Sequence, residues 1–117
     1  MKTTSLTLPE FAFVEGSEHE EGGDPLYGRN VIIHNRTASV MEVFLKEDVV
    51  LEDDVVSLNF SNKNRFGIKE RMTIALHYST TLDKVSDRAM IIEEVLKPAA
   101  KWYCDYCDWM DKNVSND

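Results

Sequence analysis

The sequence predicts an α+β protein, in which a mainly antiparallel sheet of about five strands precedes a long C-terminal helix packed on one face. Short segments in the first two thirds of the chain alternate apolar and polar residues, as strands do. The last third repeats its apolar residues every three or four positions, as helices do. A chain of 117 residues is long enough for one hydrophobic core and too short for two. Residues 1–117 are therefore expected to form a single domain.

The N-terminal third predicts two strands separated by an acidic loop. Ser5–Val14 alternates, and Pro9, which lacks a backbone N–H, restricts this segment to an edge strand. Residues 15–25 carry five acids, three glycines and no large apolar residue, so we expect a mobile acidic loop. Tyr27–His34 predicts a second strand, and its β-branched run at residues 31–33 favours a position inside the sheet.

Residues 39–46 fit two local structures, and the sequence leaves both open. Alternation favours a strand with Met41 and Val43 on one face. A short helix is the alternative, because Ser39 and Glu42 fit a capping box. An acidic turn then precedes a further strand at Val55–Phe60.

The clearest pattern in the sequence is a long strand at Phe66–Ser79 that gives way to a helix. A polar link at residues 62–65 joins this strand to the preceding one, which predicts a β-hairpin. Consecutive strands are therefore expected to be neighbours in the sheet, as in a meander. One face of the long strand is expected to be apolar, through Ile68, Met72, Ile74, Leu76 and Tyr78.

The C-terminal helix is predicted at Leu82–Lys112, so that the long strand and the helix together occupy residues 66–112. Thr80 is expected to cap the helix N-terminus, with Asp83 completing a capping box. Pro98 removes one backbone donor and clashes with the preceding turn. It is expected either to kink the helix or to begin a second one.

The helix carries more apolar surface than one sheet can cover. A helix of this length measures roughly 45 Å, whereas a strand of seven or eight residues measures roughly 25 Å. Trp102, Tyr106 and Trp109 form an apolar stripe on its second half. Either the chain folds back after Pro98 and these side chains complete the core, or they bind a protein partner. A homodimer is the expected form of such a contact, since two-fold symmetry is the commonest.

Cys104 and Cys107 are spaced like a redox or metal-binding pair. A redox pair needs its first cysteine at a helix N-terminus, whereas this one lies late in a helix beside Asp105 and Asp108. A structural zinc site needs four ligands, and only three separated histidines are present to complete one. We expect two reduced cysteines that fill core space, and no metal.

No other residues form a recognised catalytic or cofactor-binding motif, so we expect neither an enzyme nor a cofactor. His34 and His77 lie in predicted strands without a serine, cysteine or carboxylate at a recognised spacing, and we expect structural roles for both. The net charge of −8 disfavours nucleic-acid binding. No segment resembles a signal peptide or a membrane span, which predicts a cytoplasmic protein without a membrane partner.

Three hypotheses of function follow from these patterns. The leading one is a small acidic interaction protein, which self-associates or binds a partner through Trp102, Tyr106 and Trp109. The second is a ligand-binding module with a pocket between sheet and helix, lined by Phe44, Phe60, Tyr78 and Trp102. The third is an acidic mimic of nucleic acid that inhibits a DNA-binding protein.

Overall fold

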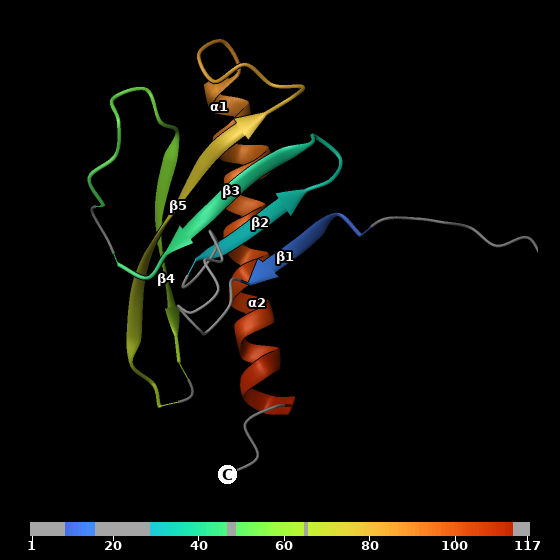
Figure 1. The fold of residues 1–117 in the computed structure, drawn as a ribbon. Helices are drawn as coiled ribbons and strands as arrows, with labels where there is room; N and C mark the ends of the chain where they lie inside the picture. Colours follow the sequence, from blue (N-terminus) through green and yellow to red (C-terminus); the bar gives the residue numbers. More distant parts are fainter. Residues whose placement is uncertain (1–8, 16–28, 47–48, 65, 114–117) are drawn as a thin grey trace, which may run out of the picture.

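The computed structural model describes residues 9–15, 29–46, 49–64 and 66–113. Most of the predicted acidic loop and the start of the predicted first strand lie outside these residues. The described part contains a five-stranded antiparallel sheet and one helical rod (Figure 1). The strands are β1 (Phe11–Glu15), β2 (Asn30–His34), β3 (Ser39–Phe44), β4 (Ser57–Lys63) and β5 (Lys69–Ser79). The helical rod consists of α1 (Arg88–Met90), the π-helical segment η1 (Ile91–Leu96) and α2 (Lys97–Asn113).

The predicted fold class is confirmed, and so are three details of the sheet. β1 lies at an edge and β2 lies inside the sheet, as their compositions predict. Residues 39–44 form a strand, so the helical alternative for this segment is wrong. The capping-box pattern does not form a helix there, because a strand buries Met41 and Val43 on one face. The two neighbouring strands, β2 and β5, also pair with the backbone of this segment.

The order of the strands is β1-β2-β3-β5-β4, which differs from a meander in one place. β4 and β5 form the predicted hairpin, but β5 lies inside the sheet and β4 at its edge. Residues 72–76 of β5 are all buried, whereas β4 alternates between exposed and half-buried residues. The more apolar strand therefore occupies the position with a neighbour on each side.

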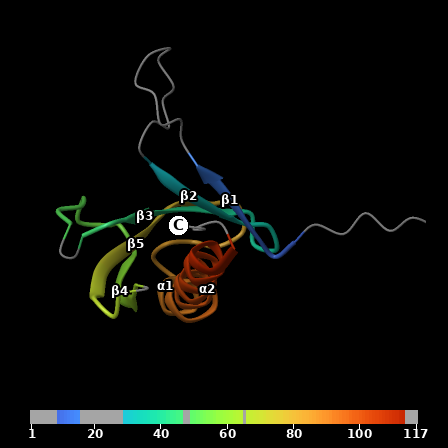
Figure 2. The same ribbon diagram turned by 90° about the horizontal axis from the view of Figure 1, so that it is seen from below.

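The helical rod covers one face of the sheet, which we call the inner face (Figure 2). The core lies between them and includes a group of fully buried side chains: Ile32, Met41, Ile74, Ile91, Val95 and Leu96. The opposite side of the sheet is called the outer face. No helix in the described ranges is long and apolar enough to cross a membrane.

The predicted start of the helix is wrong, because the helix begins at Arg88 and not near Leu82. The Asp83 carboxylate accepts hydrogen bonds from the N–H groups of Val85 and Ser86, at 2.8 and 2.9 Å. Thr80 is not the cap, since its hydroxyl, at 3.5 Å, and its N–H, at 3.1 Å, both donate to the carbonyl of Ala38. Asp83 thus organises a separate turn, and the regular helix starts only after it.

The helical rod continues through Pro98 without a break, so the chain does not fold back there. The segment before Pro98 is π-helical, and the N–H of Lys97 donates to the carbonyl of Ile92, five residues earlier. This wider, π-helical turn lies immediately before Pro98, which has no backbone N–H to donate. A kink of the helix axis at Pro98 stays a prediction.

Candidate functional site

The three aromatic residues of α2 that were predicted to bind a partner divide into a packed pair and an exposed end, while Tyr103 between them is buried in the core. The ring of Trp102 lies 5.7 Å from the ring of Phe11 and stacks on Tyr106 at 5.7 Å. Tyr106 also contacts Phe13, with ring centroids 5.2 Å apart. Trp109 lies one turn further on and is 55% exposed. The structure therefore brings Trp102 and Tyr106 together against β1 and leaves Trp109 outside this contact.

Cys104 and Cys107 are free thiols on the same helix. Burial, followed by the charges of neighbouring groups, raises the pKa of Cys104 to about 11. Burial also raises the pKa of Cys107. Both thiols are therefore protonated near neutral pH and are poor nucleophiles. Within the described ranges, no group of three or more histidine, cysteine or acidic side chains is arranged to hold a metal ion.

His34 is fully buried, and its ring nitrogens both have partners. Its Nε2 lies 3.1 Å from a Glu10 carboxylate oxygen and its Nδ1 lies 2.7 Å from the Thr37 hydroxyl. Phe11 stacks on the same ring at 4.8 Å. These contacts tie β1 to the β2–β3 turn, which is a structural role.

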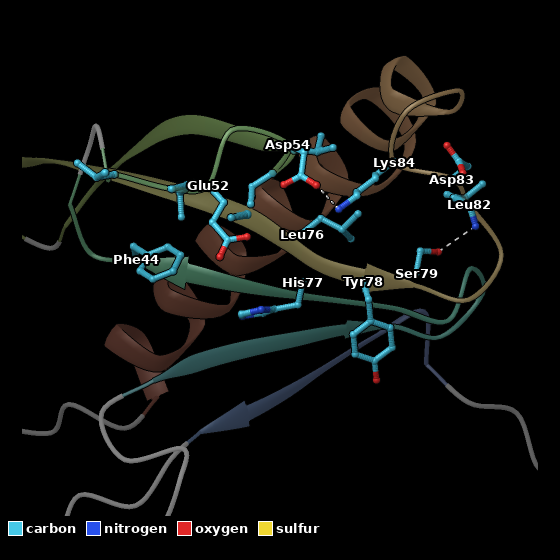
Figure 3. Close-up of a pocket in the computed structure, with 15 residues that line it drawn as sticks. Phe44, Glu52, Asp54, Leu76, His77, Tyr78, Ser79, Leu82, Asp83 and Lys84 are labelled. Carbon is cyan, nitrogen blue, oxygen red and sulfur yellow. Dashed lines mark hydrogen bonds and ion pairs between the residues drawn. The ribbon is translucent and has the colours of Figure 1, made fainter.

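A pocket of about 640 Å³ opens beside the C-terminal half of β5, on the outer face (Figure 3). Its apolar lining includes Phe44, Leu51, Val55, Val56, Leu76 and Leu82. His77, Tyr78 and several charged residues complete the lining. We call this cavity the outer pocket. Its volume is typical of sites for small molecules.

The outer pocket exists because β4 is shorter than β5. β4 pairs with β5 only as far as Ser57 opposite Ala75. Beyond that pair, a single backbone hydrogen bond of 2.9 Å joins Leu76 to Val56. The chain before β4 turns away from β5 and forms the far wall of the cavity.

A β-bulge directs two consecutive residues of β5 to the outer pocket. Val40 pairs with Tyr78 and Met41 pairs with Leu76, so His77 is the extra residue on β5. A bulge interrupts the alternation of a strand and re-aims its side chains. His77 and Tyr78 therefore both line the pocket. Tyr78 is 57% exposed, so its predicted place on the apolar face is wrong. The bulge is the reason, because it shifts the alternation of β5 at this point.

Glu42 fixes the orientation of His77 from the neighbouring strand. Its side chain is 6% exposed, and both carboxylate oxygens accept hydrogen bonds from Arg29. These hydrogen bonds with Arg29 lower the pKa of Glu42 despite its burial. The Nε2 atom of His77 lies 2.8 Å from Glu42 Oε1. The same Nε2 atom lies 3.3 Å from Nη2 of Arg29, so the ring is held between the Glu42 carboxylate and the Arg29 guanidinium.

The charges around the mouth of the outer pocket are mainly acidic. Lys84 forms an ion pair with Asp54 across the mouth. Asp83 is occupied by the turn that precedes the helix. Glu52 is exposed, and Figure 3 shows its carboxylate extending over the cavity toward the side of His77.

The predicted pocket between sheet and helix is wrong in its location. Phe60 and Trp102 pack against the core on the inner face. Phe44 and Tyr78 line the outer pocket instead, on the other side of the sheet. The four residues are therefore not brought together, because the space between sheet and helix is filled by the core.

The link between His77 and Glu42 was missed in the sequence because 35 positions separate them. One signal was present: Glu42 is the only acid within an otherwise apolar strand segment, and a buried acid requires a partner. The nucleic-acid-mimic hypothesis invokes the acids of three segments, residues 15–24, 48–54 and 105–111. Residues 16–24 and 48 lie outside the described residues, and the hypothesis stays a prediction.

Comparisons of this chain with protein-family models, with curated proteins and with solved structures find no match.

Proposed function

We propose that this protein binds a small molecule with an apolar body in the outer pocket. The observation that carries the proposal is the cavity of about 640 Å³, whose apolar wall faces an oriented histidine. Apolar cavities with a few fixed polar groups are the usual form of small-molecule sites. Leu76 and Val56 belong to the core and also line this cavity, so its apolar wall is continuous with the core.

The test fills the pocket and leaves the fold intact. Val55 is half-buried in the pocket wall, and Val55→Trp adds an indole there. Val85 is 78% exposed and lies outside the lining, so Val85→Trp is the matched control. Binding of 1-octanol is followed by changes in backbone amide NMR signals. We expect V55W to lose binding and V85W to keep it. Equal binding by V55W and wild type would contradict the proposal.

Self-association through the aromatic end of α2 is a second candidate function. The observation that favours it is Trp109, which is 55% exposed on a helix that extends beyond strands β1 to β3. Trp102 and Tyr106 continue the apolar surface toward the core. Exposed tryptophans are enriched at the centres of interfaces. The proposed partner is a second copy of this chain, in a two-fold dimer.

Light scattering of the full chain tests this second function. Wild type should measure as a dimer, and Trp109→Ala should shift it toward the monomer. Met90→Ala is the control, because Met90 is also about half exposed and lies about five turns before Trp109 in the helical rod. A monomeric wild type at high concentration would contradict the function.

Both functions are proposed for a non-enzymatic protein of the cytoplasm. The support for this location is the pair of free cysteines, which is typical of a reducing compartment.

A further inference from the structure

We propose that the ligand of the outer pocket is an amphipathic cation, with an apolar chain that ends in a protonated amine. This inference rests on the proposed function of the pocket and adds the chemical class of its ligand.

The cations near the pocket are already occupied. Lys84 is the one lysine or arginine among the lining residues, and it is paired with Asp54. Arg29 is held by both carboxylate oxygens of Glu42 and does not line the cavity. A carboxylate or phosphate ligand would therefore meet three acids of the lining without a free cation to pair with. This arrangement disfavours anions.

One acceptor of the lining remains for a donor group on the ligand. The Glu52 carboxylate forms no side-chain hydrogen bond or ion pair within the described part of the chain, and Figure 3 shows it over the cavity. An ammonium group supplies three donors and one positive charge, so it matches this carboxylate.

The apolar wall accounts for the rest of the ligand. Leu76 is 8% exposed and Val56 is 1% exposed, and both belong to the core as well as to the pocket. Phe44 closes the side below Glu52 in Figure 3. An alkyl chain that lies on this surface gains affinity from each buried methylene. A small hydrophilic cation gains no such contribution and should bind weakly.

Three probes that share one alkyl chain test the inference: octylamine, 1-octanol and octanoate, each titrated at about pH 7 and followed by NMR. At this pH the amine is protonated and the acid is ionised. We expect octylamine to bind about fivefold more tightly than 1-octanol, the upper end of the range for an exposed ion pair. We expect octanoate to bind more weakly than 1-octanol, since the acids of the lining repel it.

Two isosteric variants identify the group responsible. Glu52→Gln should reduce the affinity for octylamine to that for 1-octanol and leave 1-octanol binding unchanged. Asp53→Asn is the matched control, because Asp53 is an adjacent exposed acid outside the lining. It should keep the preference for the amine.

The outcomes separate the ligand class from the pocket itself. Equal binding of octylamine and 1-octanol, or an unchanged preference in E52Q, would overturn the cationic ligand and leave the binding function standing. Failure of all three probes to shift signals of the pocket residues would overturn both proposals.

Discussion

Glu42 is buried in the outer face of the sheet and joins two residues that are far apart in the chain. It accepts two hydrogen bonds from Arg29, and its Oε1 atom lies 2.8 Å from Nε2 of His77. A carboxylate in such a position is stable only while its partners satisfy it. Glu42 therefore contributes to the local stability and orients the histidine in the outer pocket.

We predict that Glu42→Gln lowers the free energy of unfolding by about 2 kcal/mol at neutral pH, because charged hydrogen bonds are lost in a buried site. Urea denaturation measures this change. Glu94→Gln is the control, since Glu94 is exposed on the helical rod, and it should change stability by less than about 0.5 kcal/mol. A loss in E42Q no larger than in E94Q would contradict this role.

The stability contributed by Glu42 should also depend on pH. Its pKa in the folded protein is lower than its ordinary value of 4.5, first because of Arg29. The contribution is therefore fully present above the unfolded pKa and is lost as the pH falls through the folded pKa. The difference in stability between wild type and E42Q should be constant near neutral pH and shrink below about pH 4. A difference that grows with acidification would contradict the assignment.

Single residues of the site were only partly predictable from the sequence. The alternation identified Met72, Ile74 and Leu76 as core residues, and all three are buried. It failed at Tyr78, because a bulge depends on the register of the neighbouring strand and not on local sequence. The contact between His77 and Glu42 depends on the same register.

In the turn between β4 and β5, one side chain accepts hydrogen bonds from two backbone N–H groups. Asn64 Oδ1 accepts hydrogen bonds from the N–H groups of Phe66 and Ile68, at 2.9 and 3.1 Å. Gly67 follows with a φ of +78°, a conformation that glycine adopts without strain. Together they close the hairpin that carries β5 and therefore one wall of the outer pocket.

We predict that Asn64→Ala lowers the free energy of unfolding by about 1 to 2 kcal/mol, because two backbone donors lose their acceptor. Asn62→Ala, in the adjacent strand β4, should have a much smaller effect, since no hydrogen bond of its side chain is seen in this part of the chain. Thermal denaturation of the two variants compares them directly. Equal losses would show that the Asn64 side chain does not hold the turn.

Helices and strands with a strong apolar period could be predicted from the sequence, whereas the residues at which they begin and end were predicted less well. The hairpin and the C-terminal helix follow from patterns of two and of three to four residues. The helix start was misplaced because both Thr80 and Asp83 are good caps in isolation. Thr80 is instead held by the β2–β3 turn through Ala38, which is a contact across the fold.

At the scale of the whole molecule, one core joins the sheet to the helical rod. Val95 is fully buried at this junction, between strands β4 and β5 and the helix. Val85 has the same side chain but is 78% exposed in the turn before the helix. Substitution of each valine by alanine therefore removes the same atoms from a buried site and from an exposed one, which isolates the effect of burial on stability.

We predict that Val95→Ala lowers the free energy of unfolding by about 2 kcal/mol, from lost burial and the cavity it leaves. Val85→Ala should change it by less than about 0.5 kcal/mol. Chemical denaturation of both variants makes the comparison. A small effect of V95A would mean that the helical rod is not held to the sheet by this core.

The fold class was predictable because it depends on the number and type of elements. The exchange of β4 and β5 was not, because it depends on which strand gains more from two neighbours. The outer pocket arises from that exchange together with the unequal lengths of the two strands. A site created by topology in this way has no signature in a local stretch of sequence.

The most direct test of the central proposal is an NMR titration of the full chain with 1-octanol. We expect saturable shifts of the backbone amides at residues 54–56 and 75–84, and none at residues 102–109 of α2. Absence of shifts around the outer pocket, or shifts centred on α2, would contradict it.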